Sequence, residues 1–132
     1  MSEKRAVRTE SAPAPFQGAP YSQAISAAGL VFVSGQLGIT PGETTLESKT
    51  IETQTRQVLE NVKAILEAAG SGMDRLVKTT VYLTDLTDFA AMNGVYAEFV
   101  GSVPPARATV QVAALPSGAL VEIDAIAVAS TA

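Results

Sequence analysis

Two residue types are missing from this 132-residue sequence, which contains no histidine and no cysteine. Their absence excludes disulfides, thiolate nucleophiles, Ser-His dyads and every zinc site built on histidine or cysteine. General acid–base chemistry must then come from carboxylates, tyrosine, lysine or bound water. Carboxylates alone could still hold a metal, but no acidic cluster has the spacing of a calcium loop. We therefore expect neither a metal nor a cofactor.

Aromatic residues and positive charge are also scarce. The sequence has no tryptophan, 5% aromatic residues and a net charge of -4. Three basic residues, Lys4, Arg5 and Arg8, lie close together near the N-terminus, and the others form no stripe. Nucleic acids are bound by basic surfaces and aromatic stacking platforms. The composition therefore predicts no nucleic-acid partner.

Long apolar runs are absent as well. No segment approaches the roughly 20 apolar residues of a membrane helix, and the first ten residues lack the apolar core of a secretory signal. We expect a cytoplasmic protein with no membrane partner. The length and the 47% content of hydrophobic residues fit one domain, residues 1–132, around a single core. Within it, residues 1 to about 15 are expected to form a loosely ordered arm with a short edge strand near residues 6–8.

Two helices are predicted. From Ile51 to Ala69 apolar residues recur with helical spacing, Thr50 can serve as the N-cap, and Gly70 follows as a C-terminal cap. The second helix is expected over residues 88–100 and contains Gly94, which costs about 1 kcal/mol relative to alanine.

Six strands complete the prediction, with Ala28-Gly29 as the tight turn of a hairpin. They are expected near residues 6–8 and at residues 22–27, 30–34, 76–83, 106–113 and 120–129. The order of elements predicts an α+β fold, a six-stranded mixed sheet with both helices on one face.

Strand alternation predicts which side chains face the helices. In the last strand Glu122, Asp124, Ile126 and Val128 are assigned to the uncovered face. Arg107, Thr109 and Gln111 are assigned to the same face, and Val77 is assigned with Thr79, Val81 and Leu83 to one face of their strand. An uncovered face that holds large apolar groups favours association. We therefore expect a homo-oligomer with this face inward.

Arg107 is the one basic residue in an otherwise apolar strand. A buried guanidinium requires an anion, and its donors fit a carboxylate in bidentate fashion. Between Pro104 and the C-terminus the other charged residues are Glu122 and Asp124. Arg107 therefore pairs either with one of these two carboxylates or with an acid from outside the protein.

Spaced motifs across nearly the whole chain resemble the RidA family of reactive-intermediate (enamine/imine) deaminases. The motifs are residues 19–24 (APYSQA), 33–36 (VSGQ), 57–66 (QVLENVKAIL), 77–83 (VKTTVYL), 93–96 (NGVY), 105–107 (PAR) and 121–123 (VEI). The resemblance implies a chorismate-mutase-like homotrimer with three clefts between subunits. It also implies hydrolysis of short-lived 2-imino or enamine acids to 2-keto acids and ammonia.

The same resemblance implies roles for individual residues. Arg107 would hold the substrate carboxylate, and Glu122 would position the attacking water. The pocket would be lined by Tyr21, Ser34, Gly35, Asn93 and Thr109. The chain departs from the family pattern at Ala19, where glycine is usual, and at Thr109, where cysteine is common.

The chemistry implied by the resemblance is feasible without histidine, cysteine or metal, because a protonated imine is already electrophilic. Desolvation should raise the pKa of Glu122 unless a cation opposes it, which suits a base that works near neutrality. Three alternatives stay open: a non-catalytic small-carboxylate-binding or regulatory trimer, an endoribonuclease or translation inhibitor, and a chorismate-mutase-type rearrangement suggested by the fold alone.

Overall fold

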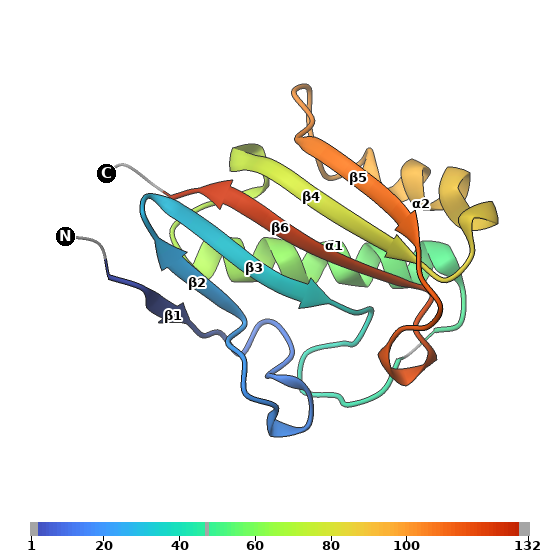
Figure 1. Ribbon diagram of the computed structural model, residues 1–132, viewed down its shortest axis with the longest axis horizontal. Coiled ribbons are helices and arrows are strands. Elements are labelled where there is room, and N and C mark those ends of the chain that lie inside the picture. The colour runs from blue at the N-terminus through green and yellow to red at the C-terminus, as the bar shows by residue number, and fades with distance from the viewer. Residues whose placement is uncertain (1–2, 47, 130–132) are drawn as a thin grey trace.

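The computed structural model describes residues 3–46 and 48–129, so Met1, Ser2 and residues 130–132 of the expected domain lie outside the described residues. Two helices and six strands form an α+β domain (Figure 1). The helices are α1 (Ile51–Ala68) and α2 (Phe89–Tyr96). The strands are β1 (Arg5–Val7), β2 (Ala24–Ala27), β3 (Leu30–Gln36), β4 (Leu76–Leu83), β5 (Ala106–Gln111) and β6 (Val121–Val128).

The six strands form one mixed sheet in the order β1-β2-β3-β6-β4-β5. The β4–β5 pair is parallel and the other neighbours are antiparallel. Both helices lie behind the sheet in Figure 1, and its other face is uncovered. The predicted mixed sheet with two helices on one face is therefore confirmed.

Local sequence signals account for the hairpin and for α1. Ala28 and Gly29 have φ of 53° and 78°, the left-handed pair that suits a two-residue turn between twisted strands. The Thr50 side chain accepts a hydrogen bond from the Thr53 N–H at the start of α1. Gly70, with φ of 77°, follows its end as predicted.

Helix α2 is shorter than the expected segment 88–100. Beyond Tyr96 the backbone bonds run from residue i to i−3, from Glu98 N–H to Val95 O and from Phe99 N–H to Tyr96 O. Such bonds belong to tight turns, so the α-helix ends although the apolar stripe continues. Val100 nevertheless remains buried in the core.

The core lies between the helices and the sheet. Alternate residues of β6, namely Val121, Ile123, Ala125 and Ala127, are buried against α1, as their spacing predicts. Val77 was assigned wrongly, because it is 42% exposed whereas Thr79 is buried. The β4–β6 register shifts between Leu76 and Lys78, and such an irregularity breaks the alternation on which the assignment rested.

The N-terminal segment packs against the domain more closely than its composition indicated. β1 pairs with β2, close to the edge strand expected near residues 6–8. The buried Gln23 side chain accepts a hydrogen bond from Thr9 N–H and donates to the carbonyls of Thr9, Ala12 and Pro13. One glutamine thus fixes this segment beside the cavity described below.

Candidate functional site

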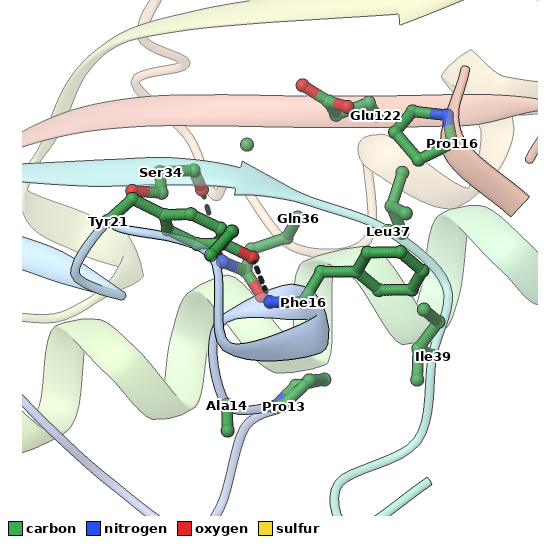
Figure 2. A pocket seen from close by; sticks show the side chains of 12 residues that line it. Pro13, Ala14, Phe16, Tyr21, Ser34, Gln36, Leu37, Ile39, Pro116 and Glu122 are labelled. Carbon is green, nitrogen blue, oxygen red and sulfur yellow. Dashed lines mark hydrogen bonds between the residues drawn. The ribbon is translucent and has the colours of Figure 1, made fainter. Parts of the chain in front are cut away.

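A cavity of about 410 Å³ lies between the N-terminal segment, the end of β3 and the turn that precedes β6 (Figure 2). Four predicted site residues line it, namely Tyr21, Ser34, Gly35 and Glu122. The rest of the wall is mostly apolar and comprises Pro13, Ala14, Phe16, Ala19, Gln36, Leu37, Ile39 and Pro116. An apolar cavity with a few converging polar groups is the usual form of a small-molecule site.

Gly35 provides the space that the Glu122 side chain occupies. A β-carbon built on Gly35 would overlap the Glu122 carboxylate, at 2.7 Å from its Cδ. The β3–β6 register is irregular between Val33 and Gln36, so the strand departs from regular pairing where it passes this carboxylate. Glycine at position 35 is therefore a requirement for the observed position of Glu122.

The environment of Glu122 favours its protonated form. Burial raises the pKa of this carboxyl above its usual value of 4.5, and the negative charge of Asp124 raises it further. The direction expected from the sequence is confirmed. A carboxyl with a raised pKa exchanges protons closer to neutral pH, as a general acid or base requires.

Tyr21 and Ser34 are held by hydrogen bonds to the backbone. The Tyr21 hydroxyl accepts from Phe16 N–H at 2.6 Å, which ties the ring to the turn Phe16–Gly18 at the cavity wall (Figure 2). The Ser34 hydroxyl donates to the Ser22 carbonyl at 2.6 Å. Both side chains line the cavity. The Ser34 hydroxyl proton is hydrogen-bonded to the Ser22 carbonyl, so it is not available to donate to a ligand.

Arg107 does not lie on the uncovered face, so its predicted assignment is wrong. In the parallel β4–β5 register Arg107 is next to Thr79 and Thr109 is next to Val81, and both β4 residues are buried beneath the helices. Paired residues of neighbouring strands point to the same side. Arg107, Thr109 and Gln111 therefore share the helix side of β5.

The same register explains why alternation misassigned β5. Ala106, Ala108 and Val110 point to the uncovered face and are exposed, since β5 is the edge strand and α2 covers its other side. In β5 one alternating set of residues is small or apolar and the other is polar, but either set can face the helices when the strand lies at the edge of the sheet. Its neighbours, rather than its own pattern, decide which one occurs.

The surroundings of Arg107 are aromatic. Its Cζ lies 4.8 Å from the Tyr96 ring centroid and 5.5 Å from that of Phe89. Over residues 3–46 and 48–129 the one ion pair within 4.0 Å joins Arg56 and Glu98, so Arg107 pairs with no described carboxylate. Asn93, between the two aromatic residues on α2, has a buried Oδ1 without a hydrogen-bond partner among the described groups.

Within the single chain the predicted site residues fall into two groups. Tyr21, Ser34, Gly35 and Glu122 form what we call the Glu122 half-site. Asn93, Arg107 and Thr109, together with Phe89 and Tyr96, form what we call the Arg107 half-site. Glu122 pairs with Tyr82 on the uncovered face of the sheet, whereas Arg107 lies on the helix side. The internal ion pair between Arg107 and Glu122 or Asp124 is therefore not formed within the chain.

Comparison with known proteins identifies the family. The family model described as Endoribonuclease L-PSP matches residues 9–129.

The chain belongs to this family.

Individual relatives agree with the family assignment. A RutC family protein of Pyrococcus horikoshii is 52% identical over 124 residues, covering 94% of this chain and 97% of that protein. The 2-iminobutanoate/2-iminopropanoate deaminase of Capra hircus is 45% identical over 125 residues, covering 95% and 90%. The crystal structure of RidA from an Antarctic Psychrobacter has a TM-score of 0.89 and 45% identity, covering 94% and 98%. The predicted resemblance to the reactive-intermediate deaminases is thus confirmed, and some members of the family carry deaminase names.

Sequence reasoning missed several residues of the candidate site. Phe16 and Pro116 line the Glu122 half-site, and Phe89 and Tyr96 flank Arg107. The last two carry a signal that could have been used, since they share one face of α2 with Asn93. Tyr82 was also missed, and it donates a hydrogen bond to Asp124 at 2.9 Å beside Glu122.

Among the described segments, no helix is both long and apolar enough to cross a membrane.

Proposed function

We propose that the protein is a cofactor-independent hydrolase that converts short-lived 2-imino and enamine acids to 2-keto acids and ammonia. The relative from Capra hircus, named a 2-iminobutanoate/2-iminopropanoate deaminase, supports this class of substrate. The two half-sites also carry the groups that the reaction needs. These are a cation for the substrate carboxylate and a carboxyl group with a raised pKa.

Arg107 binds the substrate carboxylate in this proposal. Its donors match the two carboxylate oxygens, and no described carboxylate in the protomer competes for them. Binding through this group fixes the imine carbon at one distance from Arg107. The reaction then gains from the orientation of substrate and water rather than from a cofactor.

Glu122 transfers a proton from the attacking water to the leaving nitrogen. Ionised Glu122 accepts a proton from water while the water oxygen bonds to the imine carbon, and the resulting carbinolamine loses ammonia as its C–N bond breaks. The proton held by Glu122 is returned to the leaving nitrogen, the carbinolamine oxygen forms the C=O bond as the C–N bond breaks, and the hydroxyl proton passes to the again ionised Glu122 and from there to water. For 2-aminoacrylate, which first gains a proton at its terminal carbon, the sum is 2-aminoacrylate plus water giving pyruvate plus ammonia.

We also propose that the active unit is a chorismate-mutase-like homotrimer, in which each cleft combines the Arg107 half-site of one protomer with the Glu122 half-site of the next. The observation that carries the proposal is that these half-sites lie on opposite faces of the sheet. Exposed apolar side chains on the uncovered face, including Phe32 and Val110, support burial against another subunit. The expected cytoplasmic location remains a prediction.

The first test measures catalysis. 2-Aminoacrylate is generated by a separate enzyme, and pyruvate release is followed with and without the protein. Wild type should accelerate release, and Arg107→Ala should not. Arg56→Ala, which removes an exposed arginine from its ion pair with Glu98, serves as the matched control and should behave as wild type. Equal rates with and without wild-type protein would refute the proposed function.

The second test asks whether the two halves come from different chains. Arg107→Ala and Glu122→Ala are each expected to be inactive alone. When the two are unfolded together and refolded at equal concentrations, roughly a quarter of the clefts in random trimers combine an intact Arg107 with an intact Glu122. Activity should recover to about that fraction of wild type. No recovery in verified mixed trimers would show that the halves do not meet between subunits.

The family description favours a second candidate, RNA cleavage. The acidic net charge and the absence of histidine argue against it. If RNA cleavage persists at constant specific activity through further purification and is lost in Glu122→Gln, the protein is a ribonuclease. A non-catalytic carboxylate binder would instead gain thermal stability with 2-keto acids and show no turnover.

A further inference from the structure

The Arg107 side chain lies against two aromatic rings from one helix. The ring of Tyr96 is 4.8 Å from its Cζ and the ring of Phe89 is 5.5 Å away. Positions 89 and 96 are separated by seven residues, about two turns, so both rings project from the same face of α2. Both distances are within the range of a cation–π interaction.

The Tyr96 ring is itself held in place. Its hydroxyl shares a hydrogen bond of 2.7 Å with Oγ1 of Thr79, and both residues are buried, with exposed fractions of 5% and 1%. Thr79 is also the β4 neighbour of Arg107 in the parallel register. The strand next to the arginine therefore anchors one of the rings that the arginine contacts.

Within the described residues the Arg107 donors have no carboxylate partner. A planar guanidinium interacts with rings through its faces, whereas its N–H donors point outward in the plane. A ring packed on a face of the guanidinium leaves the donor edge open, and no carboxylate of the described chain pairs with the Arg107 donors. Holding the side chain in advance also reduces the conformational entropy that is lost when a ligand binds.

We propose that Phe89, Tyr96 and Thr79 form an aromatic clamp of positioning residues, which holds Arg107 with its donor edge directed to the substrate carboxylate. The inference rests on the proposed function for its kinetic consequence. The clamp itself is a property of the protein and can be measured without turnover.

The kinetic test uses Phe89→Leu, Tyr96→Phe and Thr79→Val. The clamp acts on a contact made equally in the ground and transition states, so KM for the imino acid should rise while kcat changes little. The rise should be about three- to tenfold for Phe89→Leu. The matched control is Phe99→Leu, because Phe99 lies 6.0 Å from Arg56, whose charge is paired with Glu98. It should leave KM unchanged.

The second readout is independent of activity. The Nε–Hε signal of Arg107, assigned by its loss in Arg107→Lys, should show a rigid side chain in wild type and in Phe99→Leu. It should be more mobile in Phe89→Leu and Tyr96→Phe. The same two clamp variants should bind pyruvate, used as a stable carboxylate probe, more weakly than wild type.

The outcomes separate the clamp from the proposed function. A rigid Arg107 and clamp-dependent pyruvate binding would support the clamp even if no imine were hydrolysed. A wild-type Arg107 as mobile as in the clamp variants would overturn it even if deamination were found. Lower kcat with unchanged KM and unchanged pyruvate affinity in folded clamp variants would also overturn it.

Discussion

At the scale of single residues, Gly35 and Glu122 depend on each other. The carboxylate lies where any side chain at position 35 would begin. Burial, with the charge of Asp124 in addition, raises the pKa of Glu122 at this position. Both features can be tested by substitution.

Substituting Gly35→Ala should displace Glu122. Because the new β-carbon overlaps the carboxylate, we expect a loss of stability of about 1–3 kcal/mol together with loss of activity. Chemical denaturation measures the first effect. In the Glu122→Ala background the same substitution should cost much less, giving a clear coupling energy in a double-mutant cycle. Equal costs in both backgrounds would show that Glu122 is not the cause.

Substituting Glu122→Gln should abolish activity, and it should stabilise the separated protomer, in which no neighbouring Arg107 faces this carboxyl. Burial, with Asp124 in addition, raises the folded-state pKa above 4.5, so ionisation of Glu122 opposes folding. The stabilising contribution of the protonated Glu122 to wild type is fully present at a pH below the pKa of this group in the unfolded chain. It is lost as the pH rises through the higher pKa of the folded state. Glutamine does not ionise. At a protein concentration low enough to separate the protomers, the variant should therefore melt above wild type at about pH 8, and the difference should shrink toward about pH 4. A difference independent of pH would contradict this explanation.

At the scale of elements, α2 carries a glycine that nothing in the protomer explains. A β-carbon at Gly94 would meet no atom within 4 Å, and the residue is exposed on a helix. Neither helix packing nor a close contact within the chain therefore requires glycine there.

Substituting Gly94→Ala should accordingly stabilise the helix by about 0.5–1 kcal/mol, because alanine loses less backbone entropy on folding. The melting temperature at fixed protein concentration reports the effect. Ala90→Gly, at another exposed position of α2, is the reverse control and should lower it. A lower melting temperature for Gly94→Ala would contradict the prediction and would indicate close approach by another subunit.

Strands were predicted well in position and less well in orientation. The limits of β4 were predicted correctly from its apolar residues. Val77, however, does not share the buried face of Thr79 as predicted, because the register with β6 shifts beside it. β5 begins where expected, and its assigned faces are reversed. Strand position follows from local composition, whereas orientation depends on partner strands.

At the scale of the whole molecule, the uncovered sheet face is the surface of the protomer that we expect to contact another subunit. Phe32 of β3 is 40% exposed and pairs with Ile126 of β6, so large apolar groups lie side by side there. We expect a mass of about three chains of 13.6 kDa each in light scattering.

Substituting Phe32→Glu should break that assembly, because a charge at a buried interface is costly. Light scattering should give the mass of one folded chain, and deaminase activity should be lost since each protomer holds only separate half-sites. Val103→Glu, at a position that is 83% exposed and outside the sheet, is the control and should keep both mass and activity. An active monomer would contradict the shared cleft.

The sequence by itself determined the family and the positions of the elements, because motifs, helical periodicity and capping residues are local properties, and it supplied the candidate site residues as a prediction. Only the tertiary structure decided that Arg107 and Glu122 lie on opposite faces, that Glu122 fills the space above Gly35, and that aromatic rings flank the arginine. These features depend on strand register and on neighbours remote in the chain. Alternation within one strand carries no information about either.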